Sequence, residues 1–209
     1  MKRSILILLL ITLGYNISNA QKKIIDGNIQ INFKKAKKAP KLFYTVQNVK
    51  VKGENIKKIM VRCKIKSKNK EAVDVNPFSL IDKSNKVRYR MVEFVGYKPV
   101  SFGLPTYQGK EILKKNLVNK KGRPFMNLPK YDPTIKDTFN NFDFEGYRII
   151  ESAINFRTKK KPLLSVTYYA PITMNSFIAD AFFVIQKFEK KPSFELYYGN
   201  EKIADIKIK

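Results

Sequence analysis

The sequence contains no histidine and no tryptophan, and its one cysteine is Cys63. Without histidine the chain cannot form a Ser-His or Cys-His catalytic pair, a His-ligated zinc site or an imidazole pH switch. A single cysteine likewise excludes an intrachain disulfide, a Cys-x-x-Cys redox pair and a cysteine-based zinc site. The chain also has no phosphate-binding loop, no calcium-loop spacing and no Gly-x-Ser-x-Gly motif. We therefore predict no metal site and no cofactor.

Long apolar runs are scarce, with one exception at the N-terminus. Lys2 and Arg3 precede an apolar core from Ile5 to Leu13, and the small residues of Ser18-Asn19-Ala20 precede Gln21. This order is typical of a secretory signal peptide cleaved before Gln21. The apolar core is too short for a membrane span, which needs about 20 apolar residues. The sequence thus predicts a signal peptide over residues 1–20, an exported product in the periplasm or outside the cell, and no transmembrane segment in the mature chain.

Acidic residues are few, with 17 Asp and Glu against 42 Lys and Arg, so the formal net charge is +25. A positive field of this strength attracts nucleic acid, anionic lipid and acidic polysaccharide, and export disfavours nucleic acid. Only seven of the cations are Arg, the residue best suited to specific phosphate or carboxylate recognition. Two interpretations stay open. The lysines either solvate the surface and block edge-to-edge strand pairing, or they bind an anionic partner.

Alternation of apolar and polar residues predicts a mainly β protein. In residues 58–66, the side chains of Ile59, Val61, Cys63 and Ile65 fall on one face and the cations on the other. A period of two with one apolar face predicts a half-buried antiparallel strand and places Cys63 in the core. Similar segments recur toward the C-terminus. We therefore predict one domain of two packed antiparallel sheets over residues 41–209, preceded by a basic flexible leader over 21–40. A short strand over residues 29–33 of this leader stays open as an alternative.

The alternation of apolar and polar residues stops in residues 96–145, which contain five Pro and four Gly. We predict a long, partly irregular insertion there. The spacing of Leu113 and Leu117, followed by Gly122, predicts a short helix within 110–121. Residues 147–156 also repeat apolar side chains at helical spacing and favour a second short helix. Aromatic residues of the insertion either pack it onto the sandwich or stack on bases or sugar rings.

Cations gather in the first part of this insertion, where residues 98–130 contain eight Lys and Arg and one acid, Glu111. A cluster of this kind is the best candidate in the sequence for contact with an anionic ligand. The candidate ligand-binding residues are Lys114, Lys115, Lys120, Lys121 and Arg123.

Carboxylates gather just after the cations and supply the alternative, enzymatic hypothesis. Glycoside cleavage needs two carboxyl groups held about 5–9 Å apart across a cleft. If they are not catalytic, these carboxylates serve as counter-charges to the basic segment or as turn residues. The candidates are Asp132, Asp137, Asp143, Glu145 and Glu151.

Two parts of the chain resemble a known family. The first is the run Ile59-x-Val61-x-Cys63-x-Ile65-x-Ser67 with Val75-Asn76-Pro77-Phe78-Ser79-Leu80-Ile81-Asp82 and Tyr89, and the second is Ala181-Phe182-Phe183-Val184 with Phe194-x-Leu196-x-Tyr198. Together they resemble secreted bacterial immunoglobulin-like domains of unknown function, similar in architecture to mycobacterial immunoprotective extracellular antigens. The resemblance implies an immunoglobulin-like antiparallel β-sandwich with an extracytoplasmic binding or accessory role, and it supplies no catalytic residues.

These observations lead to one expected function and one alternative. We expect a secreted or periplasmic, non-enzymatic binding or accessory protein, whose partner is an anionic polymer or an envelope protein. The alternative is a carboxylate-dependent hydrolase that acts on an envelope polymer.

Overall fold

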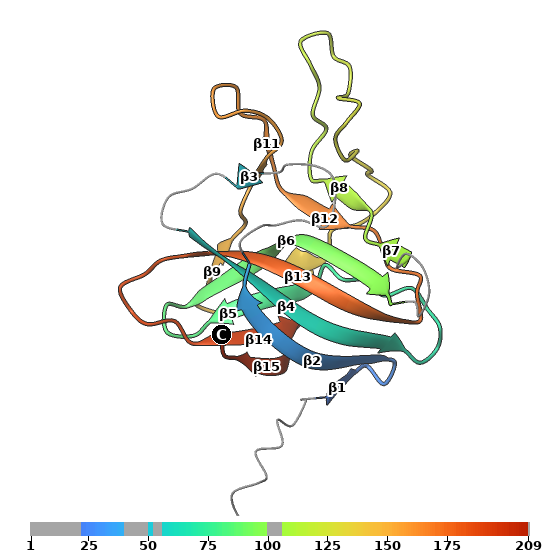
Figure 1. The fold of residues 1–209 in the computed structure, drawn as a ribbon, viewed down its shortest axis with the longest axis vertical. Coiled ribbons are helices and arrows are strands. Elements are labelled where there is room, and N and C mark those ends of the chain that lie inside the picture. The colour runs from blue at the N-terminus through green and yellow to red at the C-terminus, as the bar shows by residue number, and fades with distance from the viewer. Residues whose placement is uncertain (1–21, 40–49, 52–55, 100–105, 209) are drawn as a thin grey trace, which may run out of the picture.

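The computed structural model describes residues 22–39, 50–51, 56–99 and 106–208, and it is mainly β with antiparallel pairing (Figure 1). Within these residues the only helical element is the 3-10 turn η1 (Phe139–Asn141). None of the described residues forms a helix with the length and apolar character that a bilayer span requires. The predicted signal peptide, residues 1–20, lies outside the described residues.

The described residues form fifteen strands with the following bounds: β1 (Lys22–Ile25), β2 (Ile29–Lys38), β3 (Lys50–Val51), β4 (Ile56–Ser67), β5 (Phe78–Asp82), β6 (Val87–Lys98), β7 (Thr106–Gln108), β8 (Glu111–Leu113), β9 (Arg148–Ile150), β10 (Ile154–Asn155), β11 (Leu164–Ser165), β12 (Thr167–Tyr169), β13 (Ser176–Gln186), β14 (Phe194–Tyr198) and β15 (Glu201–Ile206).

The main sheet has the strand order β1-β2-β4-β13-β6-β5-β14-β15, with β7 and β9 also paired to β6. Strand β13 lies near the middle and pairs with β4 along its whole length. The two ends of the path approach each other: β15 lies against β1 and β2, and Lys23 Nζ is 2.8 Å from a Glu201 carboxylate oxygen across the gap. The sheet is therefore rolled into a nearly closed, barrel-like shape (Figure 1).

The rolled sheet replaces the two packed sheets that the alternation predicts. Strand β13 pairs with β4 on one side and β6 on the other, so the N-terminal and C-terminal strands belong to one hydrogen-bonded path. The pairing register shifts at Phe33/Lys35, Phe182/Phe183 and Leu196/Tyr197. Such shifts mark bulges, which add bend and twist to the sheet and let it curl around its own apolar face.

The core lies inside this curled sheet. Ile59, Val61, Cys63 and Ile65 of β4 are at most 2% exposed, and they share one core cluster with side chains of β13 such as Phe183. The predicted burial of the alternating face of 58–66 is thus confirmed. Burial also raises the pKa of the Cys63 thiol far above its usual range, with a smaller contribution from the Asp180 charge.

The described residues of the segment 21–40, where we predict a basic flexible leader, include the strands β1 and β2. Residues Ile29–Lys38 form β2, which pairs with β4. Ile31 and Ala36 of this strand are buried in the core. The apolar side chains between the lysines therefore outweigh the charge run, whose cations point away from the core.

Both predicted short helices are also wrong. In the segment 110–121, Glu111–Leu113 forms β8, which pairs with β12. In the segment 147–156, Arg148–Ile150 and Ile154–Asn155 form β9 and β10. Helix propensity is a weak preference, and pairing with strands far away in the sequence overrides it here.

Candidate functional site

Two loops protrude from the same end of the molecule, at the top of Figure 1. The first, residues 114–130, follows β8, and the second, residues 156–163, connects β10 to β11. The loops touch, because the Arg157 guanidinium carbon lies 4.5 Å from the centre of the Phe125 ring. We call these two loops together the basic crest.

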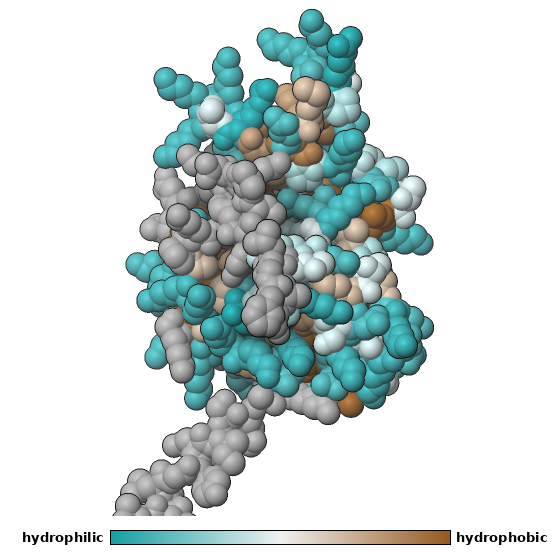
Figure 2. All heavy atoms as spheres, turned by 45° about the vertical axis from the view of Figure 1, so that its right-hand side comes forward, coloured by the Kyte–Doolittle hydropathy of each residue, from teal (hydrophilic) through white to brown (hydrophobic). Residues whose placement is uncertain are grey.

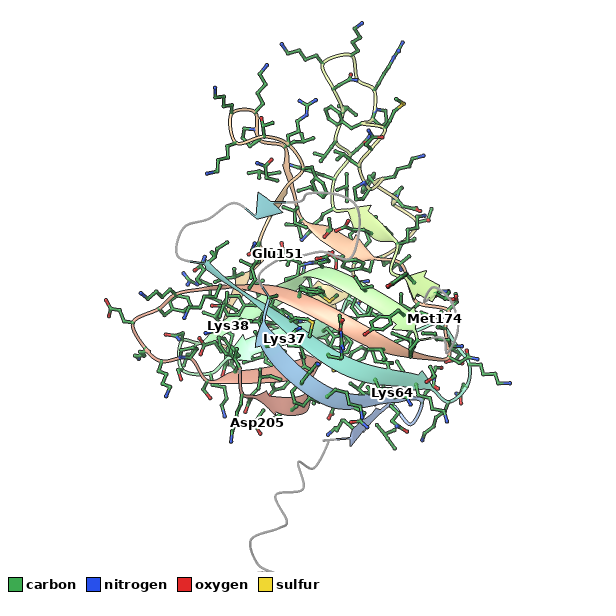
Figure 3. All side chains as sticks on the ribbon, viewed as in Figure 1. Lys37, Lys38, Lys64, Glu151, Met174 and Asp205 are labelled. Carbon is green, nitrogen blue, oxygen red and sulfur yellow. The ribbon has the colours of Figure 1, made fainter. Side chains whose placement is uncertain are left out.

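The charge of the crest has one sign only. No Asp or Glu occurs from residue 112 to 131 or from 152 to 179. Figure 2 shows hydrophilic side chains at the tips of this end with some hydrophobic ones between them, and Figure 3 shows the long side chains of both loops pointing outward. The exposed cations of the crest, which form no ion pair within the described residues, are Lys115, Lys120, Lys121, Arg123, Lys130, Arg157, Lys159, Lys160 and Lys161.

Asparagine side chains fix the shape of both loops. The Asn119 side-chain oxygen accepts hydrogen bonds from the backbone N–H groups of Lys121 (2.8 Å) and Arg123 (3.2 Å). The buried Asn155 side-chain oxygen accepts from the N–H groups of Arg157 (3.1 Å) and Leu163 (3.0 Å). Because these bonds hold the turns in place, less conformational entropy is lost when the cations bind a partner.

The loops are also joined at their base. Strands β8 and β12 pair, and the Lys114 N–H donates to the Val166 carbonyl at 2.9 Å. On the other side of the first loop, the Leu113 N–H donates to the Lys130 carbonyl at 3.1 Å. The two groups of cations are thus held in one arrangement, although they are far apart in the sequence.

Four of the five predicted ligand-binding residues belong to the free cations of the crest, and Lys114 does not. Its ammonium group lies 2.9 Å from both carboxylate oxygens of Glu151 and 3.9 Å from Asp137. Its charge is therefore neutralised within the protein.

The second loop contributes cations that our sequence prediction missed, namely Arg157, Lys159, Lys160 and Lys161. The run Arg-Thr-Lys-Lys-Lys before Pro162 is visible in the sequence and could have drawn attention to them. Only the contact between Arg157 and Phe125 shows that they share one surface with the first loop.

The candidate carboxylates of the hydrolase hypothesis have other partners. Arg90 of β6, whose side chain is 4% exposed, donates to Asp137 at 2.7 Å and to Glu151 at 2.9 Å. These two carboxylates are therefore bridged by one guanidinium and act as its counter-charges. Asp132 accepts hydrogen bonds from Thr134, which hold the pKa of its carboxyl group below the usual value. Asp143 and Glu145 are exposed.

A second buried arginine, Arg88, holds residues 139–142 against the main sheet. Arg88 of β6 is fully buried and donates to the carbonyls of Phe139 (2.9 Å) and Phe142. Its guanidinium also stacks 3.9 Å from the centre of the Phe139 ring, and burial lowers its pKa to about 10. Aromatic and carbonyl groups of 139–144 thus cover the outer surface of β6, as expected for an insertion that packs onto the sheet.

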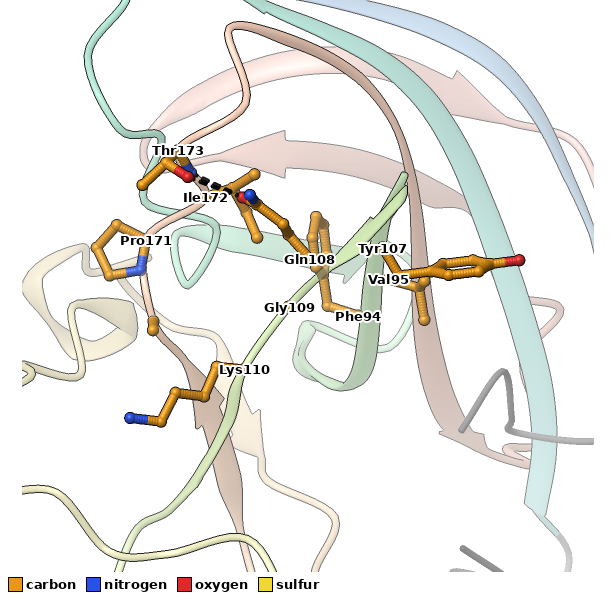
Figure 4. A pocket seen from close by; sticks show the side chains of 10 residues that line it. Phe94, Val95, Tyr107, Gln108, Gly109, Lys110, Pro171, Ile172 and Thr173 are labelled. Atoms are coloured by element: carbon orange, nitrogen blue, oxygen red, sulfur yellow. Dashed lines mark hydrogen bonds between the residues drawn. The ribbon is translucent and has the colours of Figure 1, made fainter. Parts of the chain in front are cut away.

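A pocket of about 770 Å³ lies between residues 107–110 and 170–173 (Figure 4). Phe94 and Val95 of β6 and Ile172 contribute buried apolar side chains to its lining. Tyr107, at the side of the pocket, is 54% exposed. The sequence prediction did not identify this pocket, because its walls come from segments about 60 residues apart.

Comparison with known proteins identifies no relative. No family model matches the chain, and neither a curated protein nor a solved structure resembles it significantly. Within the described residues, no group of three or more Cys, Asp and Glu side chains is placed to hold a metal ion.

Proposed function

We propose that this protein is an exported, non-enzymatic binding protein whose basic crest binds an anionic polymer. The observation that carries this proposal is the contact between Arg157 and Phe125. It unites two loops that contain no acidic residue into one surface with nine cations that form no ion pair in the described part of the chain. A polyanion that follows this surface can contact several cations at once and release its condensed counterions, so affinity rises with each contact.

The crest favours a polymer over a single small anion. Its cations are mostly lysines at the tips of exposed loops, which act as strongly hydrated point charges rather than as a rigid, bidentate fork. Such groups contribute little singly and more when many charges are bound together. Export excludes most nucleic acid from contact with the protein, so an acidic glycan or another envelope polymer is the partner class that we propose.

Two expectations from the sequence are part of this proposal. Export is supported by the charge and apolar pattern of residues 1–20. Kinship with secreted immunoglobulin-like domains, and with it the accessory role, is supported by the resemblance around Cys63 and around Phe182. Binding by an exported protein without catalysis is also consistent with the internal ion pairs of Asp137 and Glu151.

The crest can be tested with heparin as the probe polyanion, by titration at several salt concentrations. Two triple variants each remove three positive charges, one per loop: Lys120→Gln/Lys121→Gln/Arg123→Gln and Lys159→Gln/Lys160→Gln/Lys161→Gln. The matched control is Lys37→Gln/Lys38→Gln/Lys64→Gln, which removes the same charge from exposed positions on β2 and β4, far from the crest (Figure 3).

Each crest variant is expected to weaken heparin binding at least about tenfold at physiological salt and to reduce the dependence of log K on log salt by about two. The control is expected to change affinity by less than about twofold. If the control weakens binding as much as the crest variants, net charge alone is responsible and the proposal is wrong.

A further inference from the structure

The pocket beside Gly109 forms where the chain passes from one sheet to another. Strand β7 pairs with β6 of the main sheet, whereas β8 pairs with β12, and Gly109 lies between β7 and β8. Its φ of +138° is unfavourable for residues with a side chain, and an added Cβ would lie 3.0 Å from the Phe94 carbonyl oxygen. The chain changes direction at Gly109, and a slot-shaped pocket forms between this segment and residues 170–173.

Hydrogen bonds join the two walls of this slot near each of its ends. At one end the Gln108 side-chain oxygen accepts from the Thr173 N–H (3.0 Å) and hydroxyl (3.1 Å) (Figure 4). At the other end the Ala170 N–H donates to the Lys110 carbonyl at 3.0 Å. Pro171 lies between these two hydrogen-bonded positions, and it has no N–H group with which β-sheet pairing could continue. The slot is therefore preformed, and its volume of about 770 Å³ falls within the range of small-molecule sites, roughly 300–1,000 Å³.

The lining combines an apolar floor with one positive charge. The partly exposed Ala170 and the exposed Pro171 present hydrocarbon to the slot, and Phe94 and Ile172, at most 2% exposed, close its floor. Lys110 lies at the end opposite the Gln108–Thr173 pair (Figure 4). Its side chain is 67% exposed, and the Asp132 carboxylate oxygen that pairs with it is 3.8 Å away, beyond hydrogen-bond distance. The ammonium group can therefore donate to a ligand.

We propose that this pocket binds a small amphipathic organic anion. The apolar or aromatic body of the ligand lies against Ala170 and Pro171, and its carboxylate, sulfonate or phosphate group accepts hydrogen bonds from Lys110. This site is separate from the basic crest and does not depend on the function proposed for it.

The probe for the pocket is 8-anilino-1-naphthalenesulfonate, an aromatic sulfonate that fluoresces in apolar surroundings. One molecule is expected to bind per folded chain and to be displaced by decanoate, whereas decyltrimethylammonium, with the same tail and the opposite charge, displaces it at least tenfold less effectively. Lys110→Gln is expected to weaken binding of the sulfonate and of decanoate about fivefold, the effect of one exposed ion pair. Lys64→Gln, an equal charge change on β4, is expected to leave both affinities unchanged.

A second variant and a second measurement locate the site. Ala170→Leu places a larger side chain in the slot and is expected to abolish binding, with circular dichroism as the check that the fold is intact. In the unmodified protein, decanoate is expected to shift the backbone amide resonances of Gly109, Ile172 and Thr173. Equal effects of Lys110→Gln and Lys64→Gln, equal displacement by both decyl compounds, or shifts elsewhere would each overturn the proposal. The crest variants are expected to bind the sulfonate normally, so this proposal and the heparin proposal can fail separately.

Discussion

Substitution of Glu111 by Gln is expected to remove a loss of folding stability that the unmodified protein shows as pH rises. Glu111 of β8 is opposite Tyr169 of β12 in the strand register, and its carboxylate lies 3.5 Å from the Tyr169 hydroxyl. Burial raises the pKa of Glu111 from 4.5 to about 7, although hydrogen bonds from Thr167 and Tyr169 act in the opposite direction. The folded protein therefore keeps this carboxyl group neutral at pH values where the unfolded chain ionises it.

The sign and size of the effect follow from that difference. Below pH 4.5 the group is protonated in both states, and the stability is fully present. Between pH 4.5 and 7 only the folded state holds the proton, so the free energy of unfolding falls as pH rises. A difference of roughly 2.5 pKa units at 1.36 kcal/mol each gives a loss of up to about 3 kcal/mol, complete above pH 7.

Urea unfolding followed by far-ultraviolet circular dichroism, at intervals from pH 4.5 to 8.5, measures this loss. The Glu111→Gln variant has a neutral side chain of the same size at every pH. Its stability relative to the unmodified protein is expected to rise with pH by up to about 3 kcal/mol. Glu145→Gln, at an exposed position, is the control and is expected to stay within about 0.5 kcal/mol throughout. A difference for Glu111→Gln that does not vary with pH would refute the reasoning.

Two further predictions concern buried groups of the main sheet. Arg90→Met removes the shared partner of Asp137 and Glu151 and is expected to lower the free energy of unfolding by about 3 kcal/mol, measured by urea unfolding. Arg123→Met, an exposed crest position, is its control, and a loss below about 1 kcal/mol for Arg90→Met would contradict the network described above. Cys63 is expected not to react with an aromatic disulfide reagent in the native protein, because burial raises the pKa of its thiol. One equivalent is expected to react after unfolding in guanidinium, and rapid labelling of the native protein would show that the β4 core is open.

The local pattern of the sequence was enough to predict the β class and the inward face of β4. A strand places alternate side chains on opposite faces, so the order Ile59, Val61, Cys63 specifies burial without knowledge of the partner strands. The same reasoning failed for residues 110–121, where Leu113 and Leu117 have helical spacing. There the pairing of β8 with β12 decides the structure, and no local pattern reveals a partner more than 50 residues away.

The candidate site was predictable in part for the same reason. The cations at Lys120, Lys121 and Arg123 form a visible cluster in the sequence, and the structure leaves them exposed. Lys114 belongs to the same cluster, but its partner Glu151 could be identified only from the three-dimensional arrangement.

By itself, the sequence determined which chemistry is absent and which faces are apolar, because residue types and a period of two are local properties. The absence of histidine and the burial of Cys63 follow from it directly. The tertiary structure alone decided that β13 links β4 to β6 within one rolled sheet, that Arg157 contacts Phe125, and that a pocket forms beside Gly109. Each of these depends on which distant segments pair, and that choice is made by the packing of the whole chain.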